Sequence, residues 1–286
     1  MPEVSDRTGQ LDGLPVFWRE APAAGGLAEA PPLYLHGVPT NSDEWLPYLA
    51  RTGGLAPDLP GFGRSGKPGH FDYTIEGYAD FLERYLDLAG AGGKQPGGPG
   101  RVSLVVHDWG VVGLAFAQRH PERVARLVVM NAVPLLPGYR WHRSARIWRT
   151  PLVGELAMGA TTRTVLRFIS RESNATPGPL PEAFLDMILD HFDQGTQRAI
   201  LRLYRSAPPD VLAAAGARLA ELSMPSLVLW GLADPYIPAR FARAYAEALP
   251  ASELVELADA GHWPALDRPD VIDRVASFLG GGAGSG

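Results

Sequence analysis

"RVSLVVHDWGVVGLAFAQRH", residues 101–120, decides the fold that we expect for this chain. The apolar run before Asp108 predicts a buried strand, and the run that follows Gly110 predicts a helix. A strand that passes through one short turn into a helix, with a reactive side chain at the turn, is typical of a nucleophile elbow. Because aspartate also caps many helices, the turn alone does not establish a function.

Other strand patterns alternate with helical patterns along the chain. Apolar runs bounded by Gly or Pro occur in PVFWRE, PPLYLHG, RVARLVVMNAV, SLVLWGLAD and ELVELADAGH, with helical patterns between them. This alternation predicts the α/β class, with a mostly parallel central sheet flanked by helices. Residues 134–224 carry helical patterns only, so we expect an all-helical cap inserted into a core of residues 1–133 and 225–279. Residues 280–286 are expected to form a flexible tail, and the glycine-rich stretch 88–100 a surface connection.

Composition excludes several classes of function. The 286 residues carry a formal net charge of -5 and contain no cysteine, which excludes disulfides, thiolate zinc sites and cysteine nucleophiles. No apolar run approaches the roughly 20 residues of a membrane span, and the first residues lack the pattern of a signal peptide. We therefore expect a cytoplasmic protein with a small-molecule substrate and no nucleic-acid or membrane partner, and a homodimer stays open. No spacing indicates a metal or a cofactor.

Three further polar groups follow predicted strands. His36-Gly37-Val38-Pro39 comes after one strand, Asp234 after a second, and His262 lies in the loop after the last. The order Asp108, Asp234, His262 is nucleophile, acid, base, and the carboxyl ends of parallel strands meet at one edge of a sheet. The backbone N–H groups of Val38 and Trp109 are expected to form an oxyanion hole.

These residues carry a resemblance to a known family. The chain resembles the α/β-hydrolase superfamily, and its "HDWG" at residues 107–110 is similar to that of the epoxide hydrolases and haloalkane dehalogenases. The likeness covers nearly the whole chain, including DLPGFGRSGKP and HPERVARLVVMNA.

An aspartate nucleophile implies attack on saturated carbon. Serine would give an ether there, which water does not cleave at neutral pH, whereas a carboxylate gives an ester whose carbonyl belongs to the enzyme. Water activated by His262, which Asp234 orients, then frees Asp108. A non-catalytic ligand-binding protein with this fold is the alternative outside enzymes.

The leaving group separates two enzymatic hypotheses. Tyr204, followed by Arg205, is similar to the Tyr-Arg element of epoxide hydrolase caps, where the tyrosine donates a proton to the epoxide oxygen. The resemblance implies a second cap tyrosine, for which Tyr139 is the candidate, and His142 is a possible substitute donor. We therefore favour an epoxide hydrolase that produces a vicinal diol from a small, mostly apolar epoxide.

Haloalkane dehalogenase is the alternative with the same nucleophile. Val106 stands where epoxide hydrolases usually carry Gly, and an indole N–H suits a diffuse halide. Trp109, Trp141 and Trp148 are the candidate indoles, and together with His36 they are expected to line the pocket.

Overall fold

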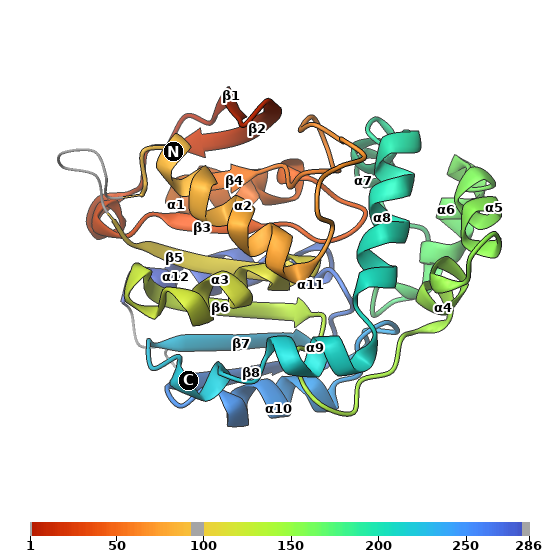
Figure 1. The fold of residues 1–286 in the computed structure, drawn as a ribbon. Coiled ribbons are helices and arrows are strands. Elements are labelled where there is room, and N and C mark those ends of the chain that lie inside the picture. Colours follow the sequence, from red (N-terminus) through yellow and green to blue (C-terminus); the bar gives the residue numbers. More distant parts are fainter. Residues whose placement is uncertain (1, 93–99, 282–286) are drawn as a thin grey trace.

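The central sheet has eight strands in the order β1-β2-β4-β3-β5-β6-β7-β8 in the computed structural model, which describes residues 2–92 and 100–281 (Figure 1). Strands β1 and β2 pair antiparallel, as do β2 and β4, and all other neighbours are parallel. The strands are β1 Ser5–Leu11, β2 Leu14–Ala21, β3 Pro32–Leu35, β4 Gly54–Pro57, β5 Val102–Asp108, β6 Val124–Ala132, β7 Ser226–Gly231 and β8 Ser252–Leu257. The predicted mostly parallel α/β sheet is thus confirmed.

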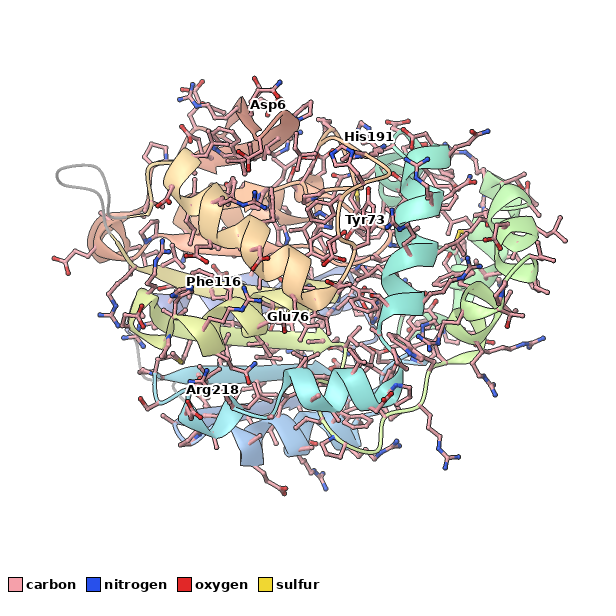
Figure 2. All side chains as sticks on the ribbon, in the orientation of Figure 1. Asp6, Tyr73, Glu76, Phe116, His191 and Arg218 are labelled. Atoms are coloured by element: carbon pink, nitrogen blue, oxygen red, sulfur yellow. The ribbon has the colours of Figure 1, made fainter. Side chains whose placement is uncertain are left out.

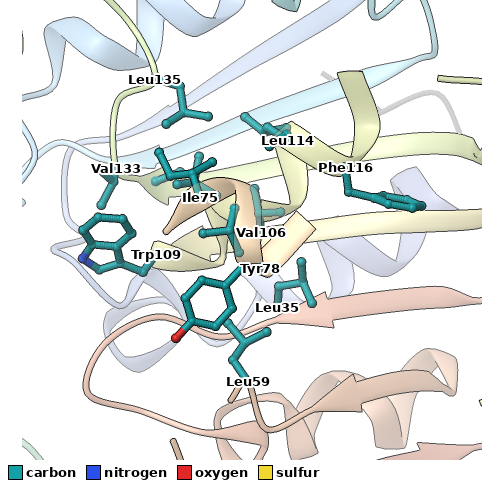
Figure 3. Packing of buried hydrophobic residues seen from close by; sticks show 14 of the residues in the cluster. Leu35, Leu59, Ile75, Tyr78, Val106, Trp109, Leu114, Phe116, Val133 and Leu135 are labelled. Carbon is teal, nitrogen blue, oxygen red and sulfur yellow. The ribbon is translucent and has the colours of Figure 1, made fainter. Parts of the chain in front are cut away.

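Helices cover both faces of the sheet. Successive side chains of each buried strand point to opposite faces, so both faces carry apolar side chains that the helices bury. In β5, Leu104 and Val106 pack in the cluster with α2, α3 and α10, while Val105 packs in the cluster with α1 and α12. Figure 3 shows residues of the first cluster, among them Val106, Leu114 and Trp109. The core helices are α1 Leu46–Thr52, α2 Ile75–Leu88, α3 Val112–Arg119, α10 Arg240–Ala248, α11 Pro264–Asp267 and α12 Val271–Leu279.

Between β6 and β7 the chain forms helices and loops only, in a segment that the structure describes in full. We call residues 133–225 the helical insertion. Its helices are α4 Arg143–Arg149, α5 Val153–Gly159, α6 Arg163–Ile169, α7 Glu182–Leu189, α8 Gln194–Ser206 and α9 Pro209–Ala215. Pro151 divides residues 142–158, HRSARIWRTPLVGELAM, between α4 and α5, because proline cannot continue a helix interior.

Helix α8 joins the insertion to the core. Figure 2 shows Tyr73 beside α8, where its carbonyl accepts a hydrogen bond of 2.9 Å from the Ser206 hydroxyl and its ring lies under the Arg202 guanidinium. Lys67 forms an ion pair of 2.7 Å with Asp193, the residue that caps α8. These contacts hold the insertion over the carboxyl edge of the parallel strands.

Short 3-10 helices complete the described fold: η1 Gly25–Glu29, η2 Ser42–Trp45, η3 Trp109–Val111, η4 Pro121–Arg123, η5 Ser170–Glu172 and η6 Leu219–Glu221. No helix in the described ranges has both the length and the apolar character that a bilayer crossing demands. Residues 93–99 of the expected surface connection and residues 282–286 of the expected flexible tail lie outside the described residues.

Candidate active site

The elbow after β5 holds Asp108 in a backbone conformation that L-residues rarely adopt, with φ of 47°. Such a conformation costs of order 1–3 kcal/mol and persists only where the surroundings enforce it. Two glycines give the turn its room. A Cβ on Gly37 would lie 2.5 Å from the Cβ of Asp108, and one on Gly110 would lie 2.0 Å from the carbonyl oxygen of Leu35.

The two carboxylate oxygens of Asp108 have different environments. Oδ2 accepts a hydrogen bond of 2.8 Å from the backbone N–H of Val38, and the N–H of Trp109 also stabilises the carboxylate. Oδ1 lies 4.0 Å from Nε2 of His262. Burial raises the pKa of Asp108, against the opposing influence of His262, His107 and these N–H groups. The structure thus brings Val38 and Trp109 together at the nucleophile.

Asp234 and His262 form the rest of the predicted triad. Nδ1 of His262 lies 2.9 Å from Oδ2 of Asp234, so Nδ1 carries a proton and Nε2 faces Asp108. Asp234 also accepts from the backbone N–H groups of Tyr236 and Ile237, at 2.7 and 3.0 Å. Although burial, the largest single influence, raises the pKa of Asp234, His262 and the hydrogen bonds together hold it below its usual value.

Asn131 is a site residue that the sequence did not predict. It lies at the end of β6 with a positive φ of 34°, and its side-chain N–H donates to Oδ2 of Asp234 at 2.8 Å. Its amide oxygen accepts from the backbone N–H of Gly231 at 2.8 Å. Asn131 therefore fixes the acid of the triad to the neighbouring strand.

A largely apolar cavity lies above Asp108 and is closed on its far side by the helical insertion. Asp108, Val38 and His262 lie at its base, and Tyr204, Trp148 and His142 contribute from α8, α4 and the start of α4. The remaining lining residues are Pro39, Ser144, Met158, Thr161, Leu166, Ile169, Ser170, Leu180, Ile188, Phe192, Ile200, Tyr236 and Trp263. Such a cavity suits a small apolar ligand whose reacting carbon approaches the carboxylate.

Tyr204 is the predicted donor that lines this cavity. Its ring contacts the indoles of Trp109, Trp141 and Trp148, with ring centroids 5.1, 4.9 and 5.0 Å away. Burial and the nearby Asp108 carboxylate raise the pKa of Tyr204 well above its usual value, so the hydroxyl keeps its proton. The Trp109 side chain forms a hydrogen bond with the Tyr204 hydroxyl, which opposes part of this rise in pKa.

Trp148 lines the cavity as expected, but the other three expected lining residues, His36, Trp109 and Trp141, lie elsewhere. His36 is buried below the cavity, where Nε2 accepts from the N–H of Leu59. Trp141 stacks on Trp109, 5.5 Å between centroids, so each indole covers the other and neither lines the cavity wall.

Tyr139 also lies away from the cavity that the expectation assigned to it. Its hydroxyl is directed to the carbonyl oxygen of Tyr236 at 3.5 Å, and its ring packs on Trp141 and Phe241. The expectation failed because Tyr139 precedes α4 and packs against Phe241 of α10 in the core. In place of Tyr139, His142 and Tyr236 reach the cavity, and burial lowers the pKa of His142 to about 4.

A buried ion pair lies behind the elbow. Nδ1 of His107 is 2.7 Å from Oε1 of Glu44, and Nε2 of His107 is 2.8 Å from the carbonyl oxygen of His262. Burial alone lowers the pKa of His107, but Glu44, Asp108 and that carbonyl raise it to about 9. His107 is therefore an imidazolium that connects η2 to the loop of His262.

Comparison with known proteins agrees with this architecture. Residues 33–275 match the model of the "Alpha/beta hydrolase family". A haloalkane dehalogenase of Mesorhizobium japonicum is 31% identical over 86% of this chain and 83% of its own. A cis-3-alkyl-4-alkyloxetan-2-one decarboxylase of Shewanella oneidensis is 28% identical over 79% of this chain and 73% of its own.

Solved structures give the same assignment. The crystal structure of haloalkane dehalogenase DbeA from Bradyrhizobium elkani superposes with a TM-score of 0.80 at 26% identity, and the match covers 98% of each chain. The predicted resemblance is confirmed: the chain belongs to the α/β-hydrolase family, in the branch that contains the haloalkane dehalogenases.

Proposed function

We propose that this protein hydrolyses a carbon–halogen bond at a saturated carbon through a covalent ester on Asp108. The asymmetry of the Asp108 carboxylate carries the covalent ester, and the relatives named haloalkane dehalogenases favour a halide as the leaving group. Oδ2 is held by the N–H of Val38, while Oδ1 faces His262 and the cavity. Oδ1 is therefore the attacking atom, and Oδ2 becomes the ester carbonyl in an oxyanion hole that already exists.

The reaction has two balanced steps. Oδ1 attacks the carbon and the halide leaves with the bonding electrons, which gives an alkyl ester. Nε2 of His262 then takes a proton from water, the hydroxide adds to Cγ of Asp108, and the N–H groups of Val38 and Trp109 stabilise the anion on Oδ2. Collapse breaks the bond between Cγ and the alkoxy oxygen, and the departing alkoxide takes the proton from His262 to become the alcohol. The proton on the oxygen that came from water then leaves to solvent, which restores the Asp108 carboxylate.

The cavity supplies a donor for a departing halide. The hydroxyl of Tyr204 lines the cavity and remains protonated, and the Trp109 side chain is its hydrogen-bond partner. The sequence favoured epoxide hydrolysis, but several relatives of this chain are haloalkane dehalogenases, which supports the other hypothesis. An epoxide remains the second candidate, because the protonated phenol of Tyr204 also suits a developing alkoxide.

The test pairs three substrates with trapped variants. Bromide release from a bromoalkane supports the proposal, diol from a styrene-oxide-like epoxide supports the second candidate, and a dialkyl oxetan-2-one tests the activity in the name of the Shewanella relative. Asp108→Asn should abolish turnover, whereas Asp190→Asn, which changes an exposed carboxylate, should not.

The ester itself is detected with His262→Gln. This variant should form the alkyl ester without hydrolysing it, so intact-protein mass spectrometry should show the alkyl adduct on a peptide that contains Asp108. Normal turnover by His262→Gln, or no heavy oxygen in the Asp108 carboxyl after one turnover in labelled water, would refute the two-step mechanism.

A further inference from the structure

The surface of α4–α6 exposes an unusual number of large apolar side chains. Eight such side chains are exposed in the described residues, and seven of them lie between positions 147 and 169. The most exposed are Leu152, Leu156 and Phe168, at 77%, 75% and 73%. Because a soluble monomer rarely exposes a large contiguous apolar patch, this cluster indicates a contact surface. We call Leu152, Val153, Leu156, Val165, Phe168 and Ile169 the apolar face.

The apolar face lies on the outer side of the helical insertion. In Figure 1, helix α8 separates the sheet from α4, α5 and α6, which form the edge of the molecule. Helix α5 buries Gly154 and Met158 and leaves its other side uncovered, and α6 buries only Leu166. No described element packs over the exposed sides of α5 and α6.

Charge on this part of the chain is opposite to that of the whole. Residues 140–171 contain seven arginines and one acidic residue, Glu155, although the protein carries a net charge of -5. Arg143, Arg146 and Arg171 are exposed and form no ion pair within the described ranges. Arg163 and Arg167 of α6 pair with Glu182 and Asp186 of α7, so the unpaired cations lie in α4, just before the apolar face in the sequence, and in η5, just after it.

We propose that the apolar face docks on an anionic lipid surface. Exposed apolar side chains bordered by arginines match the chemistry of a bilayer whose headgroups are negative and whose interior is apolar. A second copy of this chain fits less well, because it would place the same cationic border against itself. This contact is peripheral, since the helices concerned are much too short to cross a bilayer.

Docking would also bring the cavity to the lipid. Met158 of α5 and Leu166 and Ile169 of α6 line the cavity above Asp108, and Ile169 is itself 42% exposed on the apolar face. The same two short helices thus form one wall of the cavity and most of the apolar face. An apolar substrate that accumulates in the lipid would then lie next to the cavity wall.

Vesicle sedimentation without substrate tests the proposal independently of catalysis. The parent protein should sediment with vesicles of equal parts phosphatidylcholine and phosphatidylglycerol, and much less with phosphatidylcholine alone or at high salt. Removing one cation by Arg146→Ala should weaken binding about fivefold, equivalent to about 1 kcal/mol near an anionic leaflet. Leu156→Ser with Phe168→Ser should abolish binding.

Val211→Ser is the matched control, because Val211 is exposed to 39% but lies in α9 outside the apolar face. It should bind vesicles like the parent, and all variants should unfold at the parent temperature. The proposal is overturned if the parent does not bind anionic vesicles, if neutral vesicles bind equally well, or if Leu156→Ser with Phe168→Ser changes nothing. Self-association that only this double variant abolishes, without vesicle binding, would identify a dimer surface instead.

Discussion

The ion pair of His107 and Glu44 predicts a loss of stability at alkaline pH. The perturbation is the replacement of both residues by glutamine, which removes the titrating groups and keeps polar side chains. His107 has a pKa of about 9 in the folded protein against an ordinary value of 6.5. Because folding raises this pKa, the stabilisation is complete below about pH 6.5 and is lost as the pH rises through 9.

The magnitude follows from linkage between protonation and folding. A pKa of about 9 in the folded chain and 6.5 in the unfolded chain gives about 2.5 kcal/mol of stabilisation at pH 7, and almost none near pH 10. Glu44 adds nothing in this window, since its pKa is lowered and it stays ionised throughout. The difference in stability between the parent and the double variant should therefore shrink by about 2.5 kcal/mol.

Urea unfolding at several pH values between 7 and 10 measures this difference. Other groups titrate in both the parent and the double variant, so subtracting their free energies of unfolding isolates the contribution of the His107–Glu44 ion pair. The catalytic rate should fall over the same range, because Nε2 of His107 holds the carbonyl of His262 at 2.8 Å. A stability difference that stays constant from pH 7 to pH 10 would refute the assignment of His107 as a buried imidazolium.

Three further predictions concern the site. Tyr204→Phe should lower the rate of halide or alkoxide departure about 10²-fold in a pre-steady-state assay, since one donor to the developing anion is lost; an unchanged rate would contradict this role. Asp234→Asn should slow ester hydrolysis about 10⁴-fold because His262 loses its tautomer, which a burst followed by slow turnover would reveal. Gly37→Ala should lower the free energy of unfolding by about 1–3 kcal/mol, measured by thermal unfolding, and should remove activity, because its Cβ would lie 2.5 Å from the Cβ of Asp108. Full activity would show that the loop moves to accommodate the added Cβ.

Local pattern predicted most of the sheet but not its edge. The buried strands β5 to β7 are continuous apolar runs that can be read from sequence. Strand β1 is mostly exposed and polar, and the four residues of β4 include Gly54 and Pro57, which are poor strand formers, so neither was predicted. Strand β1 gains its strand character from the hairpin with β2, and β4 from pairing with β2 and β3, which are distant from it in the sequence.

The site shows the same division between local and distant determinants. Asp108, Asp234 and His262 follow strands directly, so the sheet itself brings them together. Tyr139 and Trp141 lie in an irregular segment whose path depends on packing against distant residues, such as Phe241 for Tyr139. Sequence pattern therefore predicted the catalytic edge of the sheet but not the wall that the insertion builds above it.

The uncommon backbone conformation at position 108 has an evolutionary consequence. The main chain, and not the side chain, projects this position above the sheet, and the glycines at 37 and 110 maintain the geometry. Replacing the residue at position 108 changes the nucleophile without changing the backbone turn that positions it. A single substitution at this position can thereby change the reaction of the fold between attack on an acyl carbon and attack on a saturated carbon. The other residues of the site can adapt to the new substrate afterwards.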